Sequence, residues 1–306
     1  MKNTPIVRIK SIADFHRSKG LPAPVHPLIS VIDYGTIECA EQISAHTMVL
    51  DFYNISLKRG MNAKMKYGQQ SYDFDEGVLF FLSPNQLFGI EPHHDQTVKR
   101  TGWMLLIHPD FLWNTPLAQN LKKYEFFDYA TNEALFLSEK EEATLKSIIN
   151  HIQEECVANI DKFSQSIIIS HIETLLNYSE RFYQRQFITR QKSNHQLLSR
   201  LEKLLEDYFA NEELTSNGIP SVQYIAEQLH VSSSYLGGVL KTLTGQSTQQ
   251  HIHEKLIEKA KEKLAITTFS VSEIAFQLGF EHPQSFSKLF KSKVEMSPLE
   301  FRASFN

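Results

Sequence analysis

Two stretches near the carboxyl end of the chain repeat one pattern. Residues 221–248 read SVQYIAEQLHVSSSYLGGVLKTLTGQST, and residues 270–298 read SVSEIAFQLGFEHPQSFSKLFKSKVEMSP. The copies align at one offset before a turn and at an offset one residue longer after it, which predicts two examples of one supersecondary unit. The aligned pairs are Ser221/Ser270, Ile225/Ile274, Ala226/Ala275, Leu229/Leu278, Leu236/Phe286, Leu240/Phe290 and Lys241/Lys291.

Each copy predicts two short helices joined by a sharp turn. A small residue, Ala226 or Ala275, lies where the first helix must cross closest to the second. Four positions later Gly279 accepts a positive φ without strain, whereas the first copy places His230 there, which is less comfortable. In the second helix of each copy, apolar residues four positions apart bury the inner face and leave the opposite face free.

One helix, over about residues 248–265, is predicted to join the two copies. It can hold both units rigidly, because its apolar stripe consists of Ile252, Leu256, Ala260 and Leu264. Ser232 and Ser233 are suited to cap the first copy's second helix. In the other copy Pro283 follows His282 and opens the helix, at the position where a missing N–H matters least.

A longer set of residues extends this pattern over residues 197–306. It comprises Ile225-Ala226, Val231-Ser232, Ser234-Tyr235-Leu236, Thr244-Gly245, Leu256, Ala260, Leu264, Ile274-Ala275, Gly279-Phe280, Ser285-Phe286-Ser287, Phe290-Lys291, Ser297-Pro298 and Phe301-Arg302. With these residues the segment resembles the AraC/XylS-type bacterial transcription regulators. The resemblance implies two helix-turn-helix units whose recognition helices enter successive major-groove segments, about 34–36 Å apart on one face of double-stranded DNA.

The resemblance also implies roles for the rest of the chain. The amino-terminal half fits, by layout alone, a cupin-like sensor barrel with a helical dimerisation pair. We therefore expect a homodimer, a small-molecule effector bound in the barrel and, if the protein is an activator, a contact with RNA polymerase. The leading hypothesis is a sequence-specific DNA-binding transcription regulator without enzyme activity.

Candidate DNA-reading residues lie near the start of each recognition helix. Base contact is predicted for Ser233, Ser234, Gly238, His282, Gln284, Ser285, Ser287 and Lys288. Phosphate contact is predicted for Lys241 and Lys291, with Lys293 and Arg302 nearby. Glutamine can pair with adenine and lysine with guanine. Because glycines stand at 237 and 238, the first unit is expected to read less sequence than the second, with a closer backbone approach compensating.

Charge and one backbone position argue against this hypothesis. From His195 to Asn306 the chain carries 11 Lys+Arg and 13 Asp+Glu, but phosphate binding depends on local charge. Glu295 stands where the family commonly has glycine, and a positive φ there would cost about 1–2 kcal/mol. The capping box from Ser297 to Glu300 still starts a final helix, so we expect the fold to survive.

The amino-terminal half predicts short strands followed by two helices. Residues 47–54 alternate in polarity, and residues 78–82 and 102–108 are short apolar runs closed by turn residues. Ser138 and Glu141 form a capping box before a helical stripe. A second helix is predicted over about residues 162–187, and its stripe either covers the barrel or also pairs with a second subunit.

The fold class predicted is α+β with two domains. An antiparallel, cupin-like β-barrel with trailing helices occupies residues 1–184, and the polar segment 185–196 is a linker. Residues 197–306 form an all-α domain with two helix-turn-helix units. Apolar residues make up 42% of the 306 and the net charge is −4, which excludes a wholly disordered chain.

No cofactor or metal is predicted. Cys39 and Cys156 cannot make a disulfide framework and favour a reducing, cytoplasmic location. Apolar runs are too short to span a membrane, and no secretory signal is found. The segment with Glu91, His93 and His94 lacks metal-ligand spacing for one strand face. Two alternatives stay open: a metal-dependent cupin enzyme with a helical appendage, and an effector-free architectural DNA binder.

Overall fold

The computed structural model describes residues 6–37, 46–59, 66–67, 70–71, 77–90, 101–129, 133–158, 161–189, 191–210 and 218–304. The chain divides into two compact units, Met1–Gln186 and Phe187–Asn306, which are described separately. The first unit contains β-sheets and helices, and the second unit is helical in all of its described elements. The prediction of a mixed α and β fold with a helical carboxyl-terminal part is confirmed.

The strands of the first unit form sheets of five, three and two strands. The five-stranded sheet is antiparallel and has the order β10-β7-β4-β9-β2, from Leu135–Phe136, Val78–Leu82, Tyr53–Arg59, Thr101–Ile107 and Ile29–Asp33. In the three-stranded sheet β3 (His46–Leu50) pairs in parallel with β1 (Ile6–Ile9) and antiparallel with β8 (Leu87–Ile90). The third sheet pairs β5 (Lys66–Tyr67) with β6 (Gln70–Ser71).

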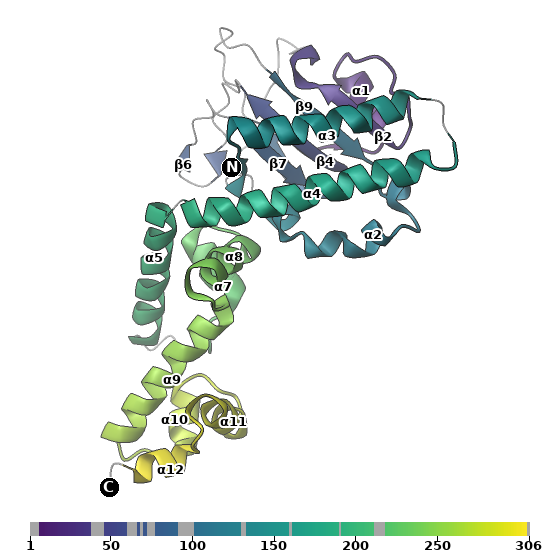
Figure 1. Ribbon diagram of the computed structural model, residues 1–306. Helices are drawn as coiled ribbons and strands as arrows, with labels where there is room; N and C mark the ends of the chain where they lie inside the picture. Colours follow the sequence, from purple (N-terminus) through teal and green to yellow (C-terminus); the bar gives the residue numbers. More distant parts are fainter. Residues whose placement is uncertain are drawn as a thin grey trace. The chain divides into compact units, whose positions relative to one another are not determined.

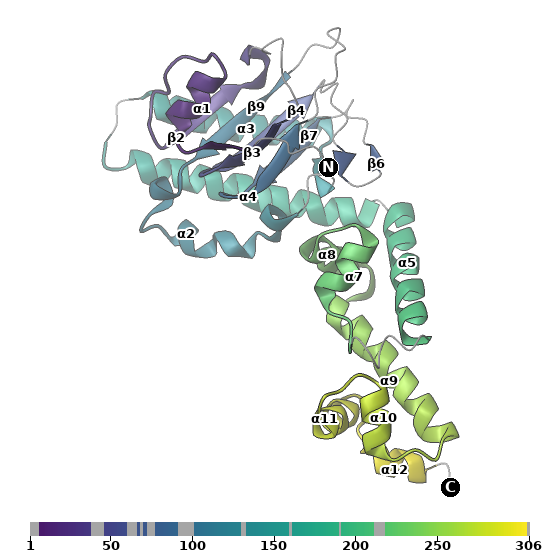
Figure 2. The same ribbon diagram turned by 180° about the vertical axis from the view of Figure 1, so that it is seen from behind.

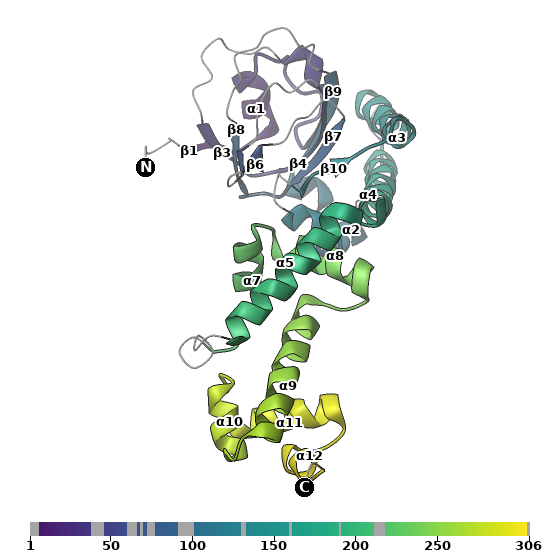
Figure 3. The same cartoon turned by 90° about the vertical axis from the view of Figure 1, so that its left-hand side faces the viewer.

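Two long helices, α3 (Glu139–Val157) and α4 (Ser164–Thr189), cover one face of the five-stranded sheet (Figures 1 and 3). The predicted capping box at the start of α3 is present. The helices lie side by side, since the rings of His151 and His171 stack with centroids 5.4 Å apart. The apolar stripe of α4 is buried inside its own unit and therefore covers the sheet: Ile168, Ile172, Leu175, Leu176 and Phe182.

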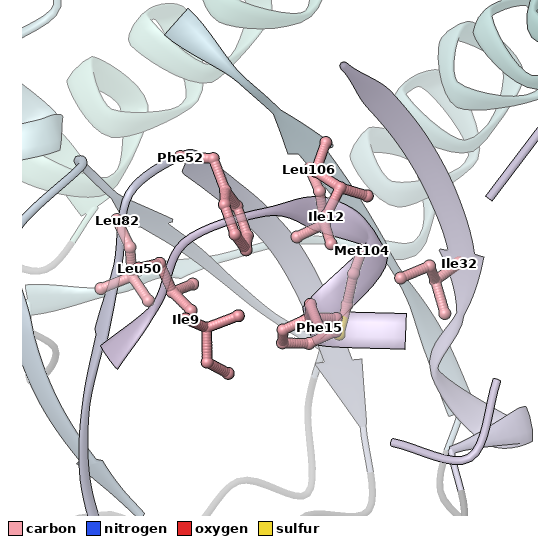
Figure 4. Close-up of a cluster of buried hydrophobic side chains, with 9 residues drawn as sticks. All are labelled: Ile9, Ile12, Phe15, Ile32, Leu50, Phe52, Leu82, Met104 and Leu106. Carbon is pink, nitrogen blue, oxygen red and sulfur yellow. The ribbon is translucent and has the colours of Figure 1, made fainter. Parts of the chain in front are cut away.

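The opposite face of this sheet packs on α1 (Ile12–Ser18) and on β1, in an apolar cluster shown in Figure 4. The rings of Phe15 and Phe52 meet edge to face, 6.2 Å apart. Figure 2 shows this side of the molecule, with β3 in front of β4 and the long helices behind. The cluster consists of Ile9, Ile12, Phe15, Ile32, Leu50, Phe52, Leu82, Met104 and Leu106.

The strand predicted at 47–54 is wrong as a single element. The chain bends at Asp51 and Phe52, so that β3 and β4 lie in different sheets. Phe52 is fully buried where the chain crosses from one sheet to the other, and burying this ring accounts for the break. Among the described strands the sheets are not joined into a closed antiparallel barrel, and the β1/β3 pair is parallel.

Residues 185–196, the segment predicted as a linker, are helical in their described positions. Residues up to Thr189 continue α4, and α5 begins at Gln191 and ends at Ala210. Phe187 is fully buried, its ring meets that of Tyr235 at 5.4 Å, and Nδ2 of Asn194 donates to its carbonyl oxygen. The polar composition of the segment concealed these two buried residues.

In the second unit α9 (Thr248–Ile266) stands between two groups of helices (Figure 3). All four residues of its predicted stripe are buried. The other helices here are α5, α7 (Val222–Leu229), α8 (Ser233–Thr244), α10 (Val271–Gln277), α11 (Pro283–Val294) and α12 (Pro298–Ala303). The first unit also contains α2 (Pro116–Asn120) and the 3-10 turns Tyr34–Thr36, Pro109–Leu112, Leu121–Lys123 and Glu125–Asp128.

Two further predictions concern cysteine and the membrane. Cys156 is buried, and burial raises the pKa of its thiol to about 11, so at neutral pH it is a small apolar group. Cys39 lies outside the described residues. In the part of the chain that the structure describes, no helix has the length and apolar character needed to cross a bilayer.

Candidate nucleic-acid interface

The first repeat folds as helix, turn and helix. Helix α7 is capped by Ser221 and ends at His230, which has the left-handed conformation (φ 60°, ψ 42°) expected there. The backbone N–H of Val231 then donates to the carbonyl of Ala226 at 3.0 Å and closes the turn. Helix α8 begins after Ser232, whose side chain accepts from the N–H of Tyr235. Both ends of the turn are thus fixed by local hydrogen bonds.

The second repeat has the same construction. Helix α10 is capped by Ser270, and the turn after it is made by Gly279 with φ of 80°. The N–H of Phe280 donates to the carbonyl of Ala275 at 3.0 Å, which is the counterpart of the bond between Val231 and Ala226. Pro283 opens α11, as predicted, and His282 gives no side-chain cap. The inserted residue therefore lies between the turn and α11.

The inner faces of α8 and α11 are buried as the repeat predicts. Ala226 and Ala275 are buried at the crossing points, and the four apolar positions of the second helices are inaccessible to solvent: Leu236, Leu240, Phe286 and Phe290. Since one helical face is used for packing, only the remaining face of α8 and α11 is available to a partner.

On α11 that face carries long polar side chains. Gln284, Lys288 and Lys291 are exposed and follow one another at spacings of four and three residues, so they line one side of the helix. On α8 the equivalent positions are Ser234, Gly238 and Lys241. Of these only Lys241 is exposed, and the other two are half-buried. The two faces place their residues at the same spacing, but the side chains on α11 are longer than those on α8.

The other predicted contact residues flank these rows. Ser233, His282 and Ser285 are exposed, and Ser287 is half-buried. The hydroxyl of Ser287 donates to the carbonyl of Pro283 at 3.0 Å, so only its oxygen lone pairs stay available to a base. Gly237 leaves the α8 surface open, because nothing lies within 4 Å of a Cβ built on it.

Helices α8 and α11 are positively charged, although residues 195–306 carry more acidic than basic side chains. Helix α11 carries three lysines and no carboxylate, and α8 carries Lys241 alone among its charged groups. The acidic residues of α9 are partly neutralised along that helix, where Lys255 pairs with Glu258 and Lys259 with Glu262. Helices α8 and α11 are therefore positively charged even though the unit as a whole is not.

Arg302 is not exposed as Lys291 and Lys293 of α11 are. It is half-buried on α12, and its Nε donates to the carbonyl of Leu264 near the end of α9 at 3.3 Å. The ring of Phe301 packs beside that of Phe290 at 5.4 Å. Arg302 therefore helps to fix α12 on α9. Its sequence position beside the lysines could not reveal that its side chain turns inward.

The metal alternative receives no support from the described residues. They contain no group of three or more His, Cys, Asp or Glu side chains that could hold a metal ion. The segment with Glu91, His93 and His94 lies outside the described residues, so the prediction made for it is not tested. His16 is buried and its Nε2 lies 2.9 Å from Oγ of Ser30, as in a hydrogen-bonded core histidine.

Comparison with known proteins agrees with the repeat. A family model described as "Helix-turn-helix domain" matches residues 225–304. The HTH-type transcriptional activator RhaS of Salmonella newport is 33% identical over 110 residues, which are 36% of this chain and 37% of RhaS. Residues 225–304 of the second unit therefore form a helix-turn-helix domain.

Other relatives differ in length from this chain. The uncharacterized HTH-type transcriptional regulator YfiF of Bacillus subtilis is 26% identical over 64% of this chain and 50% of its own. Histidine kinase P4 of Formosa agariphila is 29% identical over 39% of this chain and 8% of the kinase. The chain thus spans half or less of the length of these curated relatives.

Among solved structures, a transcriptional regulator from Chromobacterium violaceum, described as an AraC-type DNA-binding domain-containing protein, covers 37% of this chain. The match includes 95% of that protein, at 24% identity and a TM-score of 0.33.

Proposed function

We propose that this chain is a sequence-specific DNA-binding transcription regulator in which α8 and α11 read two segments of the major groove. The observation that carries the proposal is the matched pair of outer faces, Ser234/Gly238/Lys241 on α8 and Gln284/Lys288/Lys291 on α11, each presented by a helix whose inner face is buried. A helix that enters the major groove needs this separation of a packed face from a polar face.

Within the two faces the roles differ along each helix. Base contact is assigned to Ser233, Ser234 and Gly238 on the first helix and to His282, Gln284, Ser285, Ser287 and Lys288 in the second unit. Lys241 and Lys291 lie a turn or two further along and are assigned to phosphates, which position the protein without reading sequence. Gln284 and Lys288 have the longest side chains among the residues assigned to bases. The second helix-turn-helix unit therefore supplies most of the specificity for DNA sequence.

The decisive experiment is selection of binding sites from random double-stranded DNA with the full chain. We expect a site of two unequal half-sites one helical turn apart. Gln284→Ala and Lys288→Ala should each weaken binding by about 10- to 100-fold and relax selection at one or two base pairs. Lys203→Ala, on the exposed side of α5, is the control and should leave the site unchanged.

A site without sequence preference and with a steep salt dependence would instead favour the architectural DNA binder. If Lys288→Ala and Lys203→Ala behaved alike, the assignment of α11 as the reading helix would be wrong.

The first unit is proposed to sense a small-molecule effector, in a cupin-like arrangement of its sheets. Support comes from polar residues on the inner face of β4, where Asn54, Ser56 and Lys58 alternate with apolar residues and are buried. Nζ of Lys58 lies 5.2 Å from the ring of Tyr34 and 5.8 Å from that of Phe80. Metabolites that raise the melting temperature of wild type, and not of Ser56→Ala, would support an effector here.

The assembly proposed is a homodimer, with RNA polymerase as a further partner if the protein activates transcription. The buried stripe of α4 is not available for dimerisation, but Phe163 and Ile167 at its start are exposed. Sedimentation equilibrium of wild type and Ile167→Glu tests this assignment, since a charge at that position should lower the dimer fraction.

A further inference from the structure

The turn of the second helix-turn-helix unit touches the segment that leads into the first. A Cβ built on Gly279 would lie 2.9 Å from both Cα and the carbonyl carbon of Gly218, and 3.0 Å from the amide nitrogen of Ile219. Real side chains essentially never come this close to backbone. The two backbones are therefore in direct contact, at the residue that turns the chain between α10 and α11.

The segment on the other side of this contact is held in place. The hydroxyl of Tyr208, a buried residue of α5, donates to the carbonyl of Gly218 at 2.9 Å. Pro220 is buried and has a fixed φ, and Ser221 directly after it caps α7. A displacement of Gly218 is therefore passed to the start of α7, and from there to the turn before α8.

The contact adds a second connection between the two helix-turn-helix units. The first connection is α9, which is joined to α10 by a hydrogen bond of 2.9 Å from Nζ of Lys263 to Oε1 of Gln277. A single helix fixes the distance between its ends but permits bending and twisting about its axis. Two separate attachments remove most of this bending and twisting, because they constrain the second helix-turn-helix unit at two points.

We propose that the contact of Gly218 and Ile219 with Gly279 sets the interval and rotation between α8 and α11, and so determines which half-site spacing on DNA the protein accepts. The inference rests on the proposed function and deepens it. Gly218 and Gly279 act as positioning residues, since they hold the recognition helices without touching DNA themselves. Gly218 could not be singled out from the sequence, because its contact with Gly279 joins two segments that are far apart in the chain.

The test compares two glycines that share a backbone conformation. Gly279 and Gly245 both follow the last residues of a helix and have φ of 80° and 76°. A Cβ on Gly245 meets nothing within 4 Å, whereas one on Gly279 collides with Gly218 and Ile219. Gly245→Ala therefore introduces only the strain of a positive φ. Gly279→Ala introduces the same strain and also pushes the two helix-turn-helix units apart.

The measurement uses the full chain and duplexes in which the selected half-sites are moved apart or together by one and two base pairs. We expect wild type and Gly245→Ala to favour the selected spacing by at least about 10-fold over a change of one base pair. In Gly279→Ala this preference should fall by at least about 5-fold or move to another spacing. If Gly279→Ala keeps the wild-type preference, or Gly245→Ala loses as much, the inference is wrong.

A milder variant covers the case in which Gly279→Ala does not fold. Tyr208→Phe removes the hydroxyl that holds Gly218 and leaves the ring in place, and it should broaden the spacing preference while circular dichroism stays helical. An unchanged preference in a folded Tyr208→Phe protein would then count against the proposal. If the wild-type protein selects a sequence but binds all half-site spacings equally, this inference is wrong and the proposed function stands. If it selects no sequence, both the inference and the proposed function are wrong.

Discussion

At the scale of single residues, the left-handed backbone positions of the helical second unit differ in cost. His230 and Glu295 both have positive φ, near 60°, where Gly279 and Gly245 serve the corresponding positions of the other repeat. Glutamate in this conformation brings its Cβ close to the next carbonyl oxygen, which costs about 1–2 kcal/mol. At Glu295 the N–H still donates to the carbonyl of Lys291, so the helix end forms despite the strain.

Replacing this glutamate should stabilise the second unit. Glu295→Gly is expected to raise the free energy of unfolding by about 1 kcal/mol, since glycine carries no Cβ. Thermal melting followed by circular dichroism at 222 nm measures the change. Glu295→Ala keeps the Cβ and removes only the charge, so it should give little gain. Equal gains in the two variants would mean that the charge, and not the φ, is the source of the cost.

The two lysines assigned to phosphates should respond to salt. In Lys241→Ala and Lys291→Ala the slope of log affinity against log salt concentration should become shallower by about one unit, with the selected sequence unchanged. Titrations between 50 and 200 mM salt measure it. Lys203→Ala should retain the wild-type slope. Loss of sequence selection in Lys291→Ala would move that residue from the phosphates to the bases.

These residue-scale properties were predictable to different degrees. The positive φ of His230, Gly279 and Glu295 follows from the alignment of two copies, because a turn at one position predicts a turn at its partner. The inward turn of Arg302 and the contact of Gly218 depend on α9 and α10, which are distant in sequence. Periodicity within one segment contains no information about such contacts.

At the scale of elements, helix α8 carries two adjacent glycines, Gly237 and Gly238, in its outer face. Each costs about 1 kcal/mol in a helix relative to alanine. A side chain at 237 would meet no neighbour in the protein. Packing therefore does not require glycine at this position. Under the proposed function, a close approach of the helix backbone to DNA would explain it.

Stability and DNA affinity should therefore move in opposite directions in Gly237→Ala. The melting temperature should rise with a gain of about 0.5–1 kcal/mol, because the helix loses less entropy on folding. Affinity for the selected site should fall, because the methyl group holds the helix away from the groove. Fluorescence anisotropy and thermal melting measure the two quantities. A variant that gains in both would refute a close backbone approach.

The start of α3 is fixed to α4 by one carboxylate. Nε and Nη2 of Arg185 donate to Glu141 at 3.0 and 2.7 Å, and the N–H of Ser138 donates to it at 2.9 Å. Burial raises the pKa of Glu141, but the hydrogen bonds from Ser138 and Arg185 outweigh burial and lower the pKa overall. The stabilisation is therefore present above the pKa of the unfolded chain, about 4.3, and is lost as pH falls through the lower folded pKa.

Glu141→Gln should accordingly destabilise the first unit by about 2 kcal/mol at pH 7, with a smaller difference from wild type at pH 3. Both tryptophans, Trp103 and Trp113, belong to this unit, so tryptophan fluorescence during urea unfolding reports on it selectively. Glu139→Gln, on an exposed residue of the same helical turn, is the control. A difference that stays constant between pH 7 and pH 3 would contradict the role of the charged carboxylate.

Elements differed in how well the sequence predicts them. The helical half and the run 78–82 follow from periodicity and capping residues. The segment 47–54 does not, because alternation also occurs where a chain bends between two sheets, and only the burial of Phe52 distinguishes the cases. Local pattern specifies the type of an element here more reliably than the sheet it joins.

At the scale of the whole molecule, the limits of the two units determine which fragment can fold. Phe187 is fully buried against the ring of Tyr235, and Asn194 holds its carbonyl. A fragment of residues 187–306 should therefore be more stable than one of residues 197–306 by about 3 kcal/mol, the cost of removing a buried phenylalanine. Thermal melting of both fragments measures this difference, and equal stabilities would place the boundary at the later residue.

The unequal outer faces of α8 and α11 have a consequence for gene arrangement. Since one face bears Ser234 and Gly238 and the other Gln284 and Lys288, the protein has a head and a tail when it lies on a duplex. Inverting the operator in front of a promoter would turn the protein end for end and carry its other surfaces away from, or toward, the transcription start. Under the proposed function, the site read by one protomer should therefore have a direction along the chromosome, with its two unequal half-sites always in the same order.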